Sequence, residues 1–89
     1  MNKARRKSLK AILERMDELT AVIEEVKEDL QVVMDEEEEA LGNLPESLQE
    51  GERGQQMQEY IDTLEGVIDS LSELDTQDLY EKIEEIAEG

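Results

Sequence analysis

The chain has 89 residues, of which 26 are acidic and nine are basic, so its formal net charge is -17, and it contains neither histidine nor cysteine. Without these residues a Ser-His or Cys-His nucleophile is excluded, as are the Glu-x-x-His ligands of helical di-iron bundles. The length predicts one small domain over residues 1–89, and a hydrophobic content of 37% argues against simple disorder. We expect no enzyme, no catalytic residue and no cofactor.

The apolar runs are short. The longest, such as Val32-Val33-Met34, contain three residues, which is far below the length of a membrane-spanning helix. The charged first residues also lack the apolar region of a signal peptide. The sequence therefore predicts a cytoplasmic protein with no membrane partner.

The first predicted element is a helix over about residues 2–41, a range that contains no glycine or proline. Its apolar residues follow at alternating steps of three and four, which is the spacing of the a and d positions of a heptad repeat. The predicted core or oligomer contacts on this helix are Leu9, Ile12, Met16, Leu19, Ile23, Val26, Leu30 and Val33.

The start of this helix is basic. Six of the nine basic residues lie within residues 1–15, namely Lys3, Arg5, Arg6, Lys7, Lys10 and Arg15. In an antiparallel hairpin this end lies beside the acidic close of the chain, where Glu81, Glu84, Glu85 and Glu88 would face it. A patch for nucleic acid or an anionic membrane is the rival interpretation, but no aromatic residues are interleaved with the basic ones. We therefore expect no direct nucleic-acid partner.

Residues 42–54 contain the helix breakers and are predicted to form a turn. Gly42 is placed to end the first helix, Asn43 to cap the next segment, and Pro45 to lie in the first turn of a new helical segment. Gly51 and Gly54 are expected to precede the second long helix. A connection of this size usually joins antiparallel neighbours.

The second long helix is predicted over about residues 55–88, with core or oligomer contacts at Ile61, Leu64, Ile68 and Leu71. The heptad frame shifts at Asp75, within a candidate break at residues 75–78. This shift indicates either a cap that starts a short third helix or a four-residue stutter within one long helix. A continuous or kinked helix is the preferred interpretation.

The fold class expected from these elements is all-α: an antiparallel, coiled-coil-like helical hairpin. Its apolar stripes are wider than one two-helix contact needs, because further apolar columns flank the heptad core. These columns are Leu13, Met34 and Leu41 in the first helix and Tyr60, Val67 and Leu74 in the second. They predict a homodimer that forms a four-helix bundle, unless a folded-back third helix covers them.

The acidic run at residues 35–39 imitates a calcium loop. An EF-hand pattern would use the positions Asp35, Glu37, Glu39, Leu41, Asn43 and Glu46. The sixth position of that loop requires glycine for a sharp turn, but Ala40 stands there. We interpret the run as a solvated last turn of the first helix and expect no metal site.

Two function classes remain. The preferred one is a structural or assembly protein whose carboxylates are a solvated face. The alternative is an acidic antagonist of a host protein. Its carboxylates would bind the basic surface of the groove in which that protein holds nucleic acid. The candidate partner-binding residues are Glu36, Glu37, Glu38, Glu39, Asp62, Glu65, Asp69 and Glu73.

The segment NLPESLQEGERGQQM at residues 43–57 resembles a group of short acidic helical proteins from phages and mobile elements of Gram-positive bacteria. The matching residues are Asn43, Leu44, Pro45, Glu46, Ser47, Arg53 and Gly54. The resemblance implies a genomic context in which small proteins often bind host machinery. It implies no particular activity and assigns no functional residue.

Overall fold

The computed structural model describes all residues from 1 to 89, and every regular element in it is a helix. The four helices are α1 (Lys3–Gly42), α2 (Glu46–Gln49), α3 (Glu52–Glu73) and α4 (Thr76–Glu88). The prediction of an all-α helical hairpin is confirmed. The helices form two compact units, which we call unit 1 (residues 1–25 and 74–89) and unit 2 (residues 26–73).

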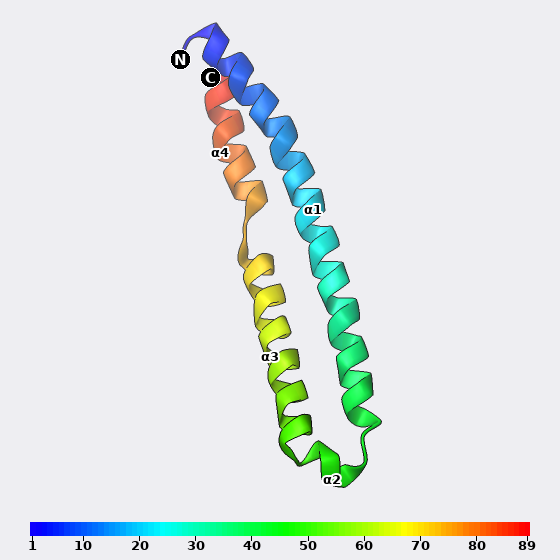
Figure 1. Cartoon of the computed structure of the whole chain (residues 1–89). Helices are drawn as coiled ribbons and strands as arrows, with labels where there is room; N and C mark the ends of the chain where they lie inside the picture. Colours follow the sequence, from blue (N-terminus) through cyan, green and yellow to red (C-terminus); the bar gives the residue numbers. More distant parts are fainter. The chain divides into compact units, whose positions relative to one another are not determined.

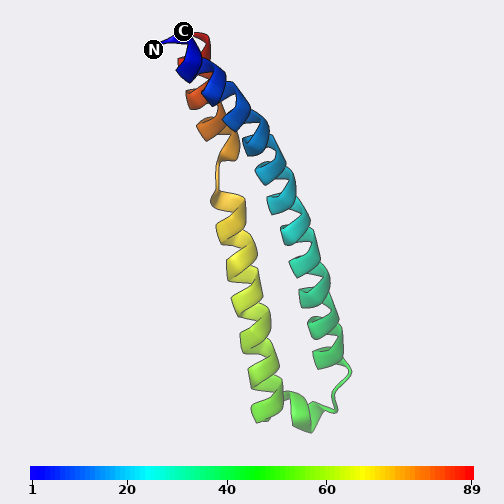
Figure 2. The same ribbon diagram turned by 45° about the horizontal axis from the view of Figure 1, so that its top comes forward.

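Within each unit a later helix runs antiparallel to a part of α1 (Figures 1 and 2). In unit 1 this helix is α4, and in unit 2 it is α3, which is joined to α1 through the short helix α2. The long first helix was expected over residues 2–41. It begins one residue later because Asn2 caps it: the Asn2 side chain accepts a hydrogen bond of 2.9 Å from the backbone N–H of Arg5.

The turn contains more helix than expected. The predicted turn of residues 42–54 includes all of α2 and the first three residues of α3. Pro45, rather than Asn43, is the residue that precedes α2, and no side chain caps that helix. The side-chain amide of Gln49 instead donates hydrogen bonds to the carbonyl oxygens of Leu44 (2.8 Å) and Gly42 (3.3 Å), which ties α2 to the end of α1.

Gly54 was expected to lie in the turn, but it is buried in the first turn of α3. A Cβ atom at this position would overlap the backbone carbonyl group of Gln49. This glycine is needed because two backbones approach each other closely, and a left-handed conformation is not involved, since no glycine has a positive φ. The close approach allows α2 to pack directly on α3.

The preference for a continuous or kinked helix over residues 55–88 was wrong. Helix α3 ends at Glu73 and α4 begins at Thr76. The carboxylate of Asp75 accepts a hydrogen bond of 2.9 Å from the backbone N–H of Asp78 and caps α4. The capping interpretation of residues 75–78 is therefore the correct one, since a side chain that satisfies a free N–H at a helix start stabilises a new N-terminus.

An Asp75→Ala variant is expected to lose about 1 kcal/mol of stability, mainly from unit 1, because the first turn of α4 loses its acceptor. Urea titration followed by circular dichroism measures this change. Asp75→Asn, which keeps an acceptor oxygen, is the matched control and should stay within a few tenths of a kcal/mol of the parent. Equal losses in both variants would contradict the capping role.

On α3 the residues that face a neighbouring helix are those of the predicted stripe. On α1 they form a stripe that is displaced from the predicted one. On α3 the predicted core is inside: Ile61 is 3% exposed, and Leu64, Ile68 and Leu71 are partly buried. The residues of α1 that face a neighbouring helix are Arg6, Leu9, Leu13, Met16, Thr20, Ile23, Lys27, Leu30, Met34, Glu37 and Leu41.

Half of the α1 residues predicted as core or oligomer contacts therefore do not face another helix of the same chain. Leu13 and Met34, expected beside the core, are 6% and 8% exposed. Ile12, Leu19, Val26 and Val33, expected within it, are 44%, 48%, 41% and 52% exposed. The apolar stripe of α1 is three columns wide, and one neighbouring helix covers only part of such a width.

The contacting stripe of α1 includes the polar residues Thr20 and Lys27. Thr20 donates a hydrogen bond of 3.0 Å to the carbonyl oxygen of Met16, and Lys27 can lay its aliphatic stem along the contact. In α4 the residues that face α1 include Tyr80, Ile83 and Ala87. Leu79 and Ile86 of the same helix are half exposed.

Candidate interaction surfaces

The most prominent surface feature of α1 is a column of exposed apolar side chains. We call Ile12, Leu19, Val26 and Val33 the outer column; they recur every seven residues along one helix. Val22, 51% exposed, lies beside the column near its middle. Apolar side chains form no hydrogen bonds with water, and a contiguous row of exposed ones is typical of an interaction surface.

Residues of the outer column line two hollows on the surface. Ile12, Arg15, Met16 and Leu19 surround one hollow on α1. Their spacing of i, i+3, i+4 and i+7 is that of the four residues that receive one side chain of a facing helix in a coiled coil.

A second hollow, within unit 2, connects the outer column with α3. It is lined by Val33 and Glu37 from α1 and by Tyr60, Thr63 and Leu64 from α3. Tyr60 begins the column of Tyr60, Val67 and Leu74, which was expected to be left uncovered and is 54%, 42% and 54% exposed. The exposed Val33 of α1 and the exposed Tyr60 of α3 thus meet on one side of this unit.

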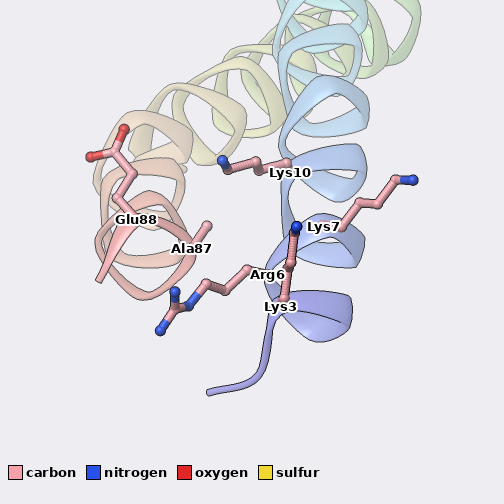
Figure 3. A pocket seen from close by; sticks show the side chains of 6 residues that line it. All are labelled: Lys3, Arg6, Lys7, Lys10, Ala87 and Glu88. Carbon is pink, nitrogen blue, oxygen red and sulfur yellow. The ribbon is translucent and has the colours of Figure 1, made fainter.

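The basic start of α1 lies beside the end of α4 in unit 1. Lys3, Arg6, Lys7 and Lys10 line a hollow with Ala87 and Glu88 (Figure 3). Arg6 and Lys10 extend toward α4, whereas Lys7 points away from it. The Nε atom of Arg6 is buried and makes no hydrogen bond. Sequence reasoning missed this inward position, although Arg6 precedes the buried Leu13 by one heptad.

The expected pairing of this end with acidic residues is seen only in part. Glu84 and Glu88 line hollows that Lys10 also lines, but no N–O distance between these groups is as short as 4.0 Å. Glu81 instead accepts a hydrogen bond from Gln77, and Glu85 is exposed. The attraction is therefore long-range and contributes little to stability at physiological salt.

Tyr80 lies close to several carboxylates of unit 1. Partial burial raises the pKa of its phenol above the ordinary 10.0, and nearby carboxylates raise it further; they belong to Asp17, Glu84, Glu88 and Glu14. The folded chain thus holds this proton to higher pH than the unfolded chain does. The contribution of the Tyr80 phenol to the free energy of unfolding is fully present below pH 10 and is lost as the pH rises through the raised pKa.

This shift predicts an alkaline titration that can be followed directly. In a Tyr60→Phe variant, absorbance at 295 nm reports on Tyr80 alone, since the chain has two tyrosines and no tryptophan. The midpoint is expected above 10.0, and adding Glu84→Gln should move it down because one carboxylate is neutralised. A midpoint at or below 10.0 in the folded protein would contradict the placement of Tyr80.

The candidate partner-binding acids lie in two places. Glu36, Glu38 and Glu39 are exposed near the end of α1, but Glu37 is partly buried and turns into the contact with α3. On α3 all four are exposed: Asp62, Glu65, Asp69 and Glu73. Arg53, the basic residue of the turn segment, is exposed and lies more than 4.0 Å from any carboxylate oxygen.

Most of the calcium-loop imitation falls on a helix. Residues 35–42 belong to α1, so the first eight of the twelve positions are helical and do not form a loop. No group of three or more acidic side chains is gathered closely enough to hold a metal ion. The ion pair between Lys82 and Asp78 (2.9 Å) is an exposed i, i+4 pair within α4.

None of the four helices combines the length and the apolar character needed to cross a membrane. Comparison with known proteins gives no further assignment, because no family model, curated protein or solved structure matches the chain.

Proposed function

We propose that the protein is a non-enzymatic assembly module that pairs with a second copy of itself through the outer column of α1. The observation that supports this proposal is the exposure of Ile12, Leu19, Val26 and Val33, each between two-fifths and about half exposed. Pairing produces a four-helix bundle, an arrangement in which apolar columns beside a hairpin contact are covered. The carboxylates then coat its outside.

The energies are compatible with a dimer of moderate affinity. Covering the remaining exposed area of one such side chain is worth about 1 kcal/mol, roughly half of its full burial. The outer column and Val22 contribute five side chains from each copy. Their sum is comparable to the association cost of about 4–15 kcal/mol, so the contact needs shape complementarity and good orientation as well as area.

The test is sedimentation of the parent chain and of two matched variants at micromolar concentration. Leu19→Glu places a charge in the outer column and is expected to give single chains with unchanged helix content. Ala21→Glu adds the same charge at an exposed position on another side of α1 and should keep the dimer. A parent chain that sediments as a monomer would overturn the proposal, as would equal behaviour of the two variants.

A second candidate function is suggested by the acidic face of α3. Asp62, Glu65 and Asp69 are exposed and have no cation within 4.0 Å, so they are free to meet a basic surface. Their carboxylates recur every ~5–6 Å along the helix, against ~3.4 Å between phosphates along one DNA strand. A groove that binds polyanions in a host protein of the phage or mobile-element setting is the corresponding partner, and it would be bound with strong salt dependence.

Capture from a host lysate with the purified chain distinguishes this candidate. A nucleic-acid-handling protein that is released by salt and displaced by duplex DNA would support it. Reversing Asp62, Glu65 and Asp69 to lysine should abolish that capture, and reversing the exposed Glu18, Glu25 and Glu28 of α1 is the matched control. Capture that survives the reversal on α3, or no captured protein at all, would eliminate the candidate.

A further inference from the structure

Charge is distributed very unevenly along α1. Residues 3–22 contain six basic and three acidic side chains, whereas residues 23–42 contain one basic and nine acidic ones. Helix α1 also has no acidic residue in its first turn and no basic residue in its last turn, so both ends oppose the helix dipole. Such a helix is electrostatically complementary to a second copy that runs in the opposite direction.

The same asymmetry is present on the face that carries the outer column. A flanking column, one helical turn from the outer column, consists of Ser8, Arg15, Val22, Asp29 and Glu36. All five are exposed. Its basic residue comes before Val22 and its acidic residues come after it, so Val22 divides the face into a basic and an acidic half.

We infer that two copies pair antiparallel along α1, with the twofold axis close to Val22. This inference rests on the proposed self-assembly and specifies its geometry. In this register Ile12 lies opposite Val33 of the second copy, and Leu19 lies opposite Val26. In the flanking column Arg15 then faces Asp29 of the second copy, and Ser8 faces Glu36 of the second copy. Every apolar residue of the outer column meets an apolar residue, and the charged pair in the flanking column joins opposite charges.

The parallel alternative pairs each residue with its own copy. Arg15 would face Arg15, Asp29 would face Asp29, and Glu36 would face Glu36. Like charges at such positions disfavour a coiled-coil pairing, whereas opposite charges select orientation more than they add affinity. The hollow bounded by Ile12, Arg15, Met16 and Leu19 is open to a side chain from a second helix in either direction. Charge therefore selects the direction of pairing, while the apolar column provides its area.

Cysteine cross-linking tests the register, because the native chain contains no cysteine. Ile12→Cys and Val33→Cys chains, one carrying a size tag, are refolded together and oxidised. A disulfide requires the two Cα atoms to be within about 7 Å. We expect a cross-linked product that contains one chain of each kind and little product from either variant alone, since two copies of residue 12 would lie ~31 Å apart at ~1.5 Å per residue.

The outcomes separate the inference from the proposed function. Self-linking of the Ile12→Cys variant alone, at the level of the mixed sample, would establish a parallel pair and overturn the inference. No cross-link in any sample, although the parent chain sediments as a dimer, would overturn the α1 pairing and leave self-assembly intact. A monomeric parent chain would overturn both. Circular dichroism of each cysteine variant verifies that it is folded.

A charge exchange gives an independent readout. Arg15→Asp is expected to weaken the dimer roughly tenfold, because it replaces two exposed attractive pairs with repulsive ones. The double variant Arg15→Asp with Asp29→Arg restores opposite charges in the antiparallel register and should recover the parent affinity. In a parallel pair the double variant would still place like charges together, so failure to recover would contradict the inference.

Discussion

An Ile61→Ala variant is expected to lose about 2–4 kcal/mol of unfolding free energy, the largest effect of any single core truncation in unit 2. Ile61 is 3% exposed and is the first residue of the predicted α3 stripe. Removing three of its carbon atoms leaves a cavity that the two neighbouring helices can close only in part. Because the core of a small helical pair is thin, a loss of this size removes a large fraction of the total stability.

The measurement is urea unfolding followed by circular dichroism, with Val67→Ala as the control. Val67 lies on the same helix and is 42% exposed, so its truncation should cost less than about 1 kcal/mol. The comparison is made at a concentration below the dissociation constant of any dimer, so that only the single chain contributes. Similar losses for the two variants would show that Ile61 is not an interior residue.

A Gly54→Ala variant is expected to lose about 1–3 kcal/mol, although alanine is the better helix former. The added methyl group overlaps the carbonyl group of Gln49, which is backbone and cannot move aside by changing a rotamer. Either α2 separates from α3 or the first turn of α3 unwinds. Both movements disturb the hydrogen bonds from the Gln49 side chain that close the end of α1.

Gly66 provides the matched control, since it lies within the same helix and has open space where a Cβ would stand. Gly66→Ala should raise stability by about 0.5–1 kcal/mol, which is the usual gain from replacing an exposed mid-helix glycine. Thermal melting of the two variants therefore gives shifts of opposite sign. A Gly54→Ala variant that melts above the parent would disprove the close approach.

The two long helices differed in how well heptad spacing alone identified the residues that face a neighbouring helix. In helix α3 the predicted core residues Ile61, Leu64 and Ile68 are the ones that face α1, and the flanking column with Tyr60 and Val67 is exposed, so heptad spacing identified the interior residues. Helix α1 has three adjacent apolar columns, and spacing cannot decide which two face the neighbour. The structure places Leu13 and Met34 inside and leaves Ile12 and Val33 outside.

The turn and the break depended on contacts between segments. Glycine in a sequence commonly indicates a chain reversal, but at Gly54 it reflects the proximity of another backbone, which no local pattern shows. Asp75 was recognised as a possible cap, yet capping and stutter have the same sequence pattern. Exposure of the carboxylates on α3 followed from their helical spacing. The partner they would bind is a property of a second molecule, so the sequence of this chain does not contain it.

The cap at Asp75 also affects how the protein opens. Helix α4 has 13 residues, close to the limit below which an isolated helix is marginal in water, and its fully buried residue is the small Ala87. It is bounded by its own cap, so it can unwind without removing any backbone hydrogen bond from α3. We therefore expect hydrogen exchange in α4 to proceed through local unfolding that costs less free energy than the global transition.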